Sequence, residues 1–158
     1  MNQTVTYTSG LKPKNLFVLL ALLCFGLTAE NLHAQNVNVN PGAGTYPTLK
    51  DAFDAINAGT HTGAITIDIV GNTTETLSAV LNASGSGAAS YSSILLRPSG
   101  GAARTISGAI TGILLDLNGA DNVTIDGLNT GGNSLTIANT ATGASNTTKI
   151  ILYASKLY

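Results

Sequence analysis

The chain has 158 residues, room for one domain of ordinary size, and a formal net charge of −1 at pH 7. Charged residues make up 9% of it and aromatic residues 5%. So few aromatic side chains exclude a conventional core built around them. The absence of a clustered basic face excludes a nucleic-acid-binding protein, which uses such a face to displace counterions from phosphates.

Residues 1–34 are typical of a secretory signal peptide. Lys12 and Lys14 precede an uninterrupted apolar run over residues 16–27, and a polar stretch follows the run. A permanent membrane helix needs about 20 apolar residues, so this run is too short to span a bilayer. We therefore predict cleavage after Ala34, with Ala29 as the alternative site. The mature chain is then secreted or displayed on the cell surface and has no membrane span.

Cys24 is the only cysteine, and it lies inside the apolar run. Leu23 precedes it, where a lipoprotein signal would have a small residue, so we do not expect lipidation. After cleavage the chain has no thiol for a disulfide, a metal site or a nucleophile. We predict that it uses no cofactor.

Residues 35–62 are expected to form an N-terminal cap. Asparagine and valine alternate over residues 36–40, which is the pattern of a short strand. Apolar residues then recur at i, i+3, i+4 and i+7 within residues 48–58, as on one face of an α-helix. Thr48 is a suitable N-cap, and Gly59 suits the left-handed position that ends a helix.

Short aliphatic strands follow, and they recur at a fixed spacing. Ile67, Leu96 and Ile125 are the central residues of three such strands, and their numbers rise in steps of 29. Leu152 follows after a step of 27. We predict that these four strands stack in register. Each would then form the same side of one coil in a repeating structure over residues 63–158.

A second set of strands shows the same spacing. Leu77, Ile106 and Leu135 are again separated by steps of 29, and each comes shortly after a strand of the first set. A unit of roughly 27–29 residues with two or three short strands and small-residue turns fits one coil of a parallel β-helix. We therefore predict an all-β fold, a right-handed parallel β-helix with a capping strand and a short helix at its N-terminal end. No terminal helix precedes Tyr158, so we expect further coils beyond it.

Residues 44–57 read GTYPTLKDAFDAIN and are similar to the opening of pectin-lyase-like right-handed β-helix proteins. In the pectin methylesterases of that superfamily, such a segment forms the first strand and the capping helix. Together with DNVTIDG at residues 121–127, the resemblance covers most of the mature chain and implies the fold. The catalytic Asp and Arg motifs of those esterases have no counterpart here. The signal ending near Ala34 also resembles the start of large surface proteins of the Bacteroidetes type.

Three oxygen-bearing residues, Asp116, Asn118 and Asp121, are weak candidates for a metal site. Together with Asn122 and Asp126 they offer the oxygen ligands that calcium uses, but their spacing does not fit an EF-hand. Asn and Asp also occur in turns because they tolerate left-handed backbone and bond to their own main chain. We prefer the interpretation as turns and assign no metal site.

Two carboxylates occupy matching positions on the predicted strands. Asp68 and Asp126 lie two coils apart with Arg97 between them, about 10 Å at roughly 4.8 Å per strand. A carboxylate pair can hydrolyse glycosides, but an Asp–Arg–Asp column is more simply an ion-pair ladder on the outer face. We predict the ladder and assign no catalytic residue.

The remaining polar and aromatic candidates are scattered. His61 is the only histidine after cleavage, which excludes a two-histidine metal site, and a positive charge there would favour the end of the helix. Three tyrosines could stack on sugar rings if they shared one face, namely Tyr91, Tyr153 and Tyr158.

Two functions remain open. The first is a secreted or cell-surface β-helix module with a structural or adhesive role, whose partners are polysaccharides or other surface proteins. The alternative is the N-terminal cap region of a polysaccharide lyase, esterase or glycoside hydrolase with catalytic residues beyond residue 158.

Overall fold

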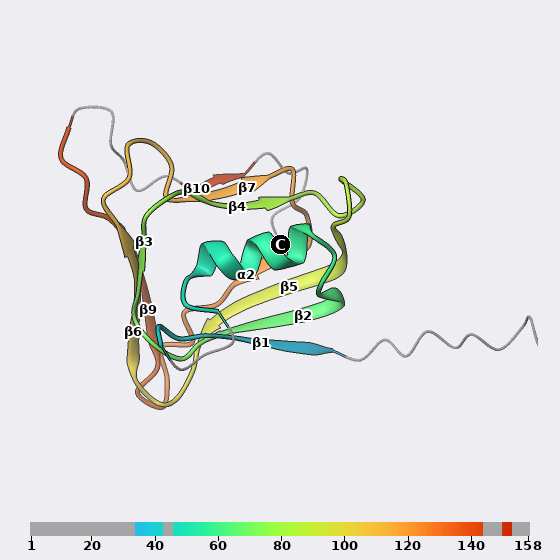
Figure 1. Ribbon diagram of the computed structural model, residues 1–158. Coiled ribbons are helices and arrows are strands. Elements are labelled where there is room, and N and C mark those ends of the chain that lie inside the picture. The colour runs from blue at the N-terminus through green and yellow to red at the C-terminus, as the bar shows by residue number, and fades with distance from the viewer. Residues whose placement is uncertain (1–33, 43–45, 144–149, 153–158) are drawn as a thin grey trace, which may run out of the picture. The chain divides into compact units, whose positions relative to one another are not determined.

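Parallel strands wind into a β-solenoid of about three turns in the computed structural model (Figure 1), which describes residues 34–42, 46–143 and 150–152. The predicted signal peptide, apart from Ala34, lies outside these residues. The parallel solenoid that the sequence predicts is confirmed, and its right-handed sense stays a prediction.

The described strands form three parallel sheets, one on each side of the coil (Figure 1). Sheet A contains, in spatial order, β1 (Gln35–Val39), β2 (Thr62–Ile69), β5 (Ser90–Pro98) and β8 (Val123–Ile125). Sheet B contains β3 (Thr73–Glu75), β6 (Ala103–Gly108) and β9 (Ser134–Asn139). Sheet C contains β4 (Ala79–Asn82), β7 (Leu115–Asn118) and β10 (Ile150–Leu152).

The predicted alignment of Ile67, Leu96 and Ile125 on neighbouring strands is confirmed in sheet A. Ile67 pairs with Leu96, and Leu96 pairs with Ile125. Ile67 and Leu96 are 0% and 1% exposed because they point into the coil and stack on each other. Parallel pairing of equivalent strands therefore produces the constant step between these residues in the sequence.

The predicted register of the second set is wrong. In sheet B, Ile106 pairs with Thr73 and with Ile137, which replace Leu77 and Leu135 as its partners. Leu77 is 60% exposed and lies in the bend between β3 and β4. Its spacing from Ile106 matches sheet A by coincidence, because the loops that enter sheet B differ in length from coil to coil.

Sheet C is absent from the sequence prediction. Ala79 in β4 pairs with Leu115 in β7, a longer step along the chain than the one between paired residues of sheet A. Leu152, which was expected beside Ile125, belongs to β10 and pairs with Leu117 instead. Coils of variable loop length keep three strands in register without a constant sequence period.

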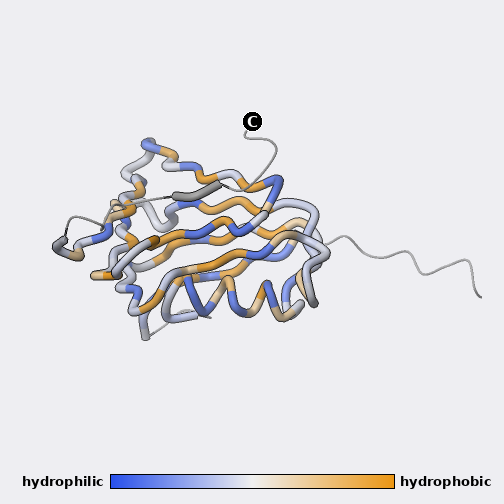
Figure 2. Tube along the Cα trace, turned by 90° about the horizontal axis from the view of Figure 1, so that it is seen from above, coloured by the Kyte–Doolittle hydropathy of each residue, from blue (hydrophilic) through white to orange (hydrophobic). Residues whose placement is uncertain are grey.

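Helix α2 (Leu49–Asn57) closes the N-terminal end of the coil, where sheet A has an additional strand, β1. The Oγ1 atom of Thr48 accepts a hydrogen bond from the N–H of Asp51, and Gly59 adopts a φ of 75°, so both predicted ends of the helix are confirmed. Figure 2 shows the helix at one end of the stacked strands.

The N-terminus of α2 is joined to sheet B by a buried carboxylate. Glu75, at the end of β3, is 2% exposed and accepts hydrogen bonds from the N–H groups of Leu49 and Lys50, each at 3.0 Å. A helix leaves its first N–H groups without partners inside the helix, and a carboxylate at this end also favours the helix dipole. Glu75 therefore holds the helix on the first coil.

The C-terminus of α2 is joined to sheet C. The side chain of Asn57 donates to the carbonyl oxygen of Val80 and accepts from the N–H of Asn82, both at 2.9 Å. These are backbone groups of β4, which has β7 on its other side. One amide side chain thus forms the hydrogen bonds that a neighbouring strand would form. It covers part of the free edge of β4, which could otherwise pair with a strand of another chain.

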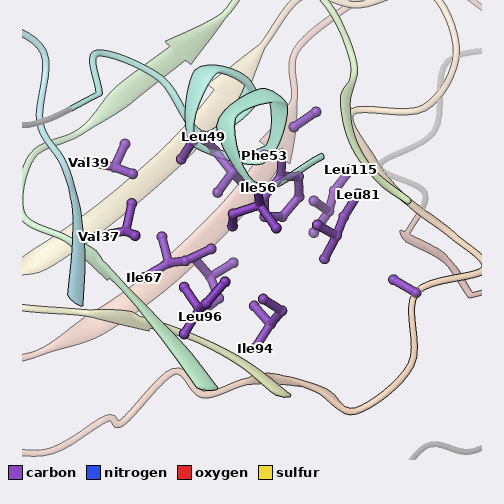
Figure 3. Packing of buried hydrophobic residues seen from close by; sticks show 14 of the residues in the cluster. Val37, Val39, Leu49, Phe53, Ile56, Ile67, Leu81, Ile94, Leu96 and Leu115 are labelled. Atoms are coloured by element: carbon purple, nitrogen blue, oxygen red, sulfur yellow. The ribbon is translucent and has the colours of Figure 1, made fainter. Parts of the chain in front are cut away.

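The apolar face of α2 completes the core at this end. Phe53 and Ile56 are at most 1% exposed and point toward Leu81 and Leu115 of sheet C (Figure 3). In the last described coil, by contrast, Ile125 and Ile137 are only partly buried. The solenoid is closed where it begins and keeps part of its aliphatic stack accessible at the third coil.

Candidate binding face on sheet A

The outer surface of sheet A carries a row of mostly polar side chains. Because successive residues of a strand point to opposite faces, the residues between the buried ones face outward, at strand separations of about 4.8 Å. We call this surface the polar face; its members are Asn36, Asn38, Thr66, Asp68, Leu95, Arg97, Thr124 and Asp126.

An ion pair lies at the centre of the polar face. The Nε atom of Arg97 donates to Oδ1 of Asp68 at 2.7 Å, across the paired strands β2 and β5. This hydrogen bond raises the pKa of Arg97 above its ordinary value. Asp68 is 5% exposed, whereas 40% of the Arg97 side chain stays exposed. The pair thus presents a fixed guanidinium group to solvent.

The predicted ladder is confirmed between Asp68 and Arg97 only. Asp126 is exposed, and its Oδ1 accepts a hydrogen bond from the N–H of Leu128 at 2.8 Å, which forms a local turn. Its charge still raises the pKa of Arg97. The guanidinium group is therefore hydrogen-bonded to Asp68 and is influenced by the charge of Asp126 without an ion pair to it among the described contacts.

The polar face is better suited to binding than to acid and base catalysis. Glycosidases hold their two carboxyl groups about 5 to 9.5 Å apart on either side of the scissile bond. Asp68 and Asp126 have a strand and a guanidinium group between them, and Asp68 is covered by its ion pair. Hydroxyl, amide and guanidinium groups in fixed positions can instead form hydrogen bonds with a polar ligand.

The three candidate metal ligands are divided between a strand and a loop. Asp116 and Asn118 lie on β7, so the interpretation of these two residues as turn residues is wrong. The Nδ2 atom of Asn118 donates to Oδ1 of Asn82 on the neighbouring strand, at 3.1 Å. Asp121 lies beyond the strand and is exposed. Within the described ranges, no three His, Cys, Asp or Glu side chains come together to hold a metal ion.

Tyr91 is part of the core and is not a sugar-stacking residue. It is 6% exposed, and its hydroxyl group donates to the carbonyl oxygen of Asn82 at 2.6 Å. Burial, together with the nearby charge of Asp121, raises the pKa of Tyr91 to about 12. Tyr153 and Tyr158 lie outside the described residues.

His61 does not serve as a cation at the end of α2. Burial lowers its pKa below the ordinary value of 6.5, which favours the neutral ring. The ring nitrogens instead contact Tyr46 and Gln35, which come from two other segments of the cap. The sequence analysis missed this cluster because its members are far apart along the chain and follow no motif.

Comparison of the chain with protein-family models, with curated proteins and with solved structures found no match. Among the described residues, no helix has the length and apolar character needed to cross a membrane.

Proposed function

We propose that the protein is an extracytoplasmic structural and adhesive module whose polar face on sheet A contacts glycans. The observation that carries the proposal is the Asp68–Arg97 pair, which holds an exposed guanidinium group at the centre of that face. Sugar hydroxyls donate and accept hydrogen bonds, so a surface with fixed donors and acceptors suits them. The apolar run over residues 16–27 supports export of the chain.

The structural part of the proposal is supported by the two ends of the solenoid. At the N-terminal end, Glu75 and Asn57 provide partners for backbone groups of α2 and β4. At the third coil, Ile125 and Ile137 are only partly buried, although Leu96 and Ile106 beside them are each 1% exposed. The closed N-terminal end and the buried aliphatic stack suit a rigid structural module.

Glycan-array binding of the full-length chain tests the adhesive role. The substitution Thr124→Glu adds bulk and a negative charge to an exposed position of the polar face. Asn118→Glu is the matched control on the outer side of sheet C. We expect at least one glycan class to bind, with binding reduced at least tenfold by Thr124→Glu and unchanged by Asn118→Glu. Absence of binding, or equal loss in both variants, contradicts the proposal.

The second candidate is the N-terminal region of a pectin-lyase-like polysaccharide lyase, esterase or glycoside hydrolase. It is favoured by α2, which lies within residues 44–57, the segment that resembles the opening of that superfamily. Incubation of the protein with pectin and other polysaccharides separates the candidates. Degradation or de-esterification supports the enzyme, whereas binding without turnover supports the adhesive module.

A further inference from the structure

Asn118 and Gly119 form the only Asn–Gly pair in the chain. In such a pair the backbone nitrogen of the glycine can attack the side-chain amide carbon of the asparagine, because glycine has no side chain to block the approach and allows a wide range of backbone angles. Asn118 is the last residue of β7 and is exposed, so water and hydroxide reach it. The pair therefore combines a reactive sequence with an accessible position.

The reaction that this pair can undergo is deamidation by way of a succinimide ring. The N–H of Gly119 gives its proton to base, and the nitrogen forms a bond to Cγ of Asn118. The bond from Cγ to Nδ2 then breaks, and Nδ2 takes up a proton from solvent and leaves as ammonia. Water opens the ring at either of its carbonyl carbons. One product is aspartate; the other is isoaspartate, in which the main chain runs through the former side chain and is longer by one carbon atom.

Three contacts hold this segment against β4 in the folded chain. Nδ2 of Asn118, the leaving group of the reaction, donates a hydrogen bond to Oδ1 of Asn82 at 3.1 Å. The carbonyl oxygen of Asn118 accepts from the N–H of Ala83, also at 3.1 Å. Gly119 forms an antiparallel bridge with Asn82. Ring closure requires Asn118 to rotate out of its extended strand conformation, and these contacts oppose that rotation.

The fold also accounts for the glycine that makes Asn118 reactive. Gly119 adopts a φ of 74°, in the left-handed region that other residues rarely adopt. A Cβ atom at this position would lie 3.4 Å from Cβ of Ala83 on the neighbouring coil. The bend that ends β7 therefore favours glycine, and the same glycine exposes the preceding amide to attack whenever the pairing opens.

We propose that Asn118 is a deamidation site that the pairing of β7 with β4 protects and that reacts when this pairing opens. The longer main chain of the isoaspartate product no longer matches the spacing of Asn82 and Ala83 on β4. The hydrogen bond from Ala83 and the bridge of Gly119 are then lost together. Modification therefore makes a transient opening of sheet C permanent. The site lies on sheet C and does not depend on the glycan-binding role of the polar face.

Peptide mapping by mass spectrometry tests the protection in the full-length chain. The protein is incubated at mildly alkaline pH, folded in buffer and unfolded in urea, and isoaspartate is detected by enzymatic methylation. We expect deamidation at Asn118 to be at least about tenfold slower in the folded chain, because the reaction requires local opening. Equal rates in the two states, or no deamidation of Asn118 in urea, overturn the proposal.

Substitutions at Asn82 test the contact with the leaving group. Asn82→Ala removes the acceptor of Nδ2 and should accelerate the reaction severalfold in the folded chain but not in urea. Asn82→Asp keeps an acceptor oxygen and should retain the slow rate. Asn36→Ala, at an exposed asparagine of β1, is the matched control and should leave the rate unchanged. Circular dichroism establishes which variants are folded. An unchanged rate in folded Asn82→Ala, or the same acceleration in Asn36→Ala or Asn82→Asp, contradicts protection by Asn82.

Discussion

Glu75 accepts a hydrogen bond from the backbone N–H of Leu49 at 3.0 Å, which fastens the capping helix to the strand that begins at Thr73. The second carboxylate oxygen binds the N–H of Lys50, and Thr48 binds the N–H of Asp51. The helix N–H groups that normally lack partners are thus satisfied within the protein. The cap is therefore an integral part of the first coil.

Replacement of Glu75 by Gln should destabilise the protein by about 1.5 to 3 kcal/mol, the usual worth of hydrogen bonds to a charged group. The amide has only one oxygen for two N–H donors, and it has no charge for the helix dipole. Urea unfolding measures the change. Asp54→Asn is the control, since Asp54 is an exposed carboxylate of the same helix and surface ion pairs contribute about 0 to 1 kcal/mol. Equal effects of the two substitutions would show that Glu75 does not anchor the helix.

Phe53→Asp should make the protein aggregate. Phe53 is 1% exposed and faces the first coil, so a carboxylate there either stays buried without a partner or detaches the helix. Detachment would uncover the edge of β4, a template for association with another chain. Size-exclusion chromatography measures the loss of monomer, with Asp54→Ala on the exposed side of the helix as the control. A monomeric Phe53→Asp protein with unchanged thermal unfolding contradicts the role of the helix as a cap.

The position of Leu77 outside the core can be tested by comparison with Leu81, a buried residue of sheet C. Leu77 is 60% exposed, so Leu77→Ser should change the free energy of unfolding by no more than about 0.5 kcal/mol. Leu81 is fully buried, so Leu81→Ala should cost about 2 to 5 kcal/mol. Chemical denaturation of both variants measures the difference. A large loss of stability in Leu77→Ser would instead show that Leu77 is buried in line with Ile106, as its spacing in the sequence predicts.

The sequence predicted the parts of the fold in which local pattern and packing agree. The helix over residues 48–58 has both a recognisable cap and a continuous apolar face, and the constant step between Ile67, Leu96 and Ile125 follows from direct pairing in sheet A. Sheet C was missed because its paired residues are further apart along the chain than those of sheet A. Its strands are short, and β4 and β7 have loops of different lengths before them.

The candidate site was predicted less completely, for a related reason. The Asp68–Arg97 pair follows from the register of adjacent strands. The contacts of Glu75, Asn57 and His61 depend instead on how the cap folds back onto the first coil. Their partners lie 15 to 26 residues away and share no motif. Only the three-dimensional arrangement brings them together.

Thr73→Val should stabilise the protein by about 1 kcal/mol, because a buried hydroxyl without a partner costs about 1 to 3 kcal/mol and valine has the same shape without the polar atom. Thr73 is 1% exposed, and its hydroxyl oxygen has no hydrogen-bond partner among the described residues. Thr74→Val is the matched control, because Thr74 points outward from the same strand. Differential scanning calorimetry should show a higher melting temperature for Thr73→Val alone; a lower one would mean that the hydroxyl group has a partner.

The buried phenol of Tyr91 should make the protein sensitive to high pH. Its pKa of about 12 exceeds the ordinary value of 10.0, so the folded state favours the neutral phenol. Stability is then full below about pH 10 and falls as the pH rises toward the folded pKa, because the unfolded chain releases this proton first. Near-ultraviolet absorbance should show one tyrosine that ionises later than the others. In Tyr91→Phe this late transition should vanish, and the loss of the bond to Asn82 should lower stability by about 0.5 to 1.5 kcal/mol at neutral pH. A late transition that persists in Tyr91→Phe would assign the buried phenol to another tyrosine.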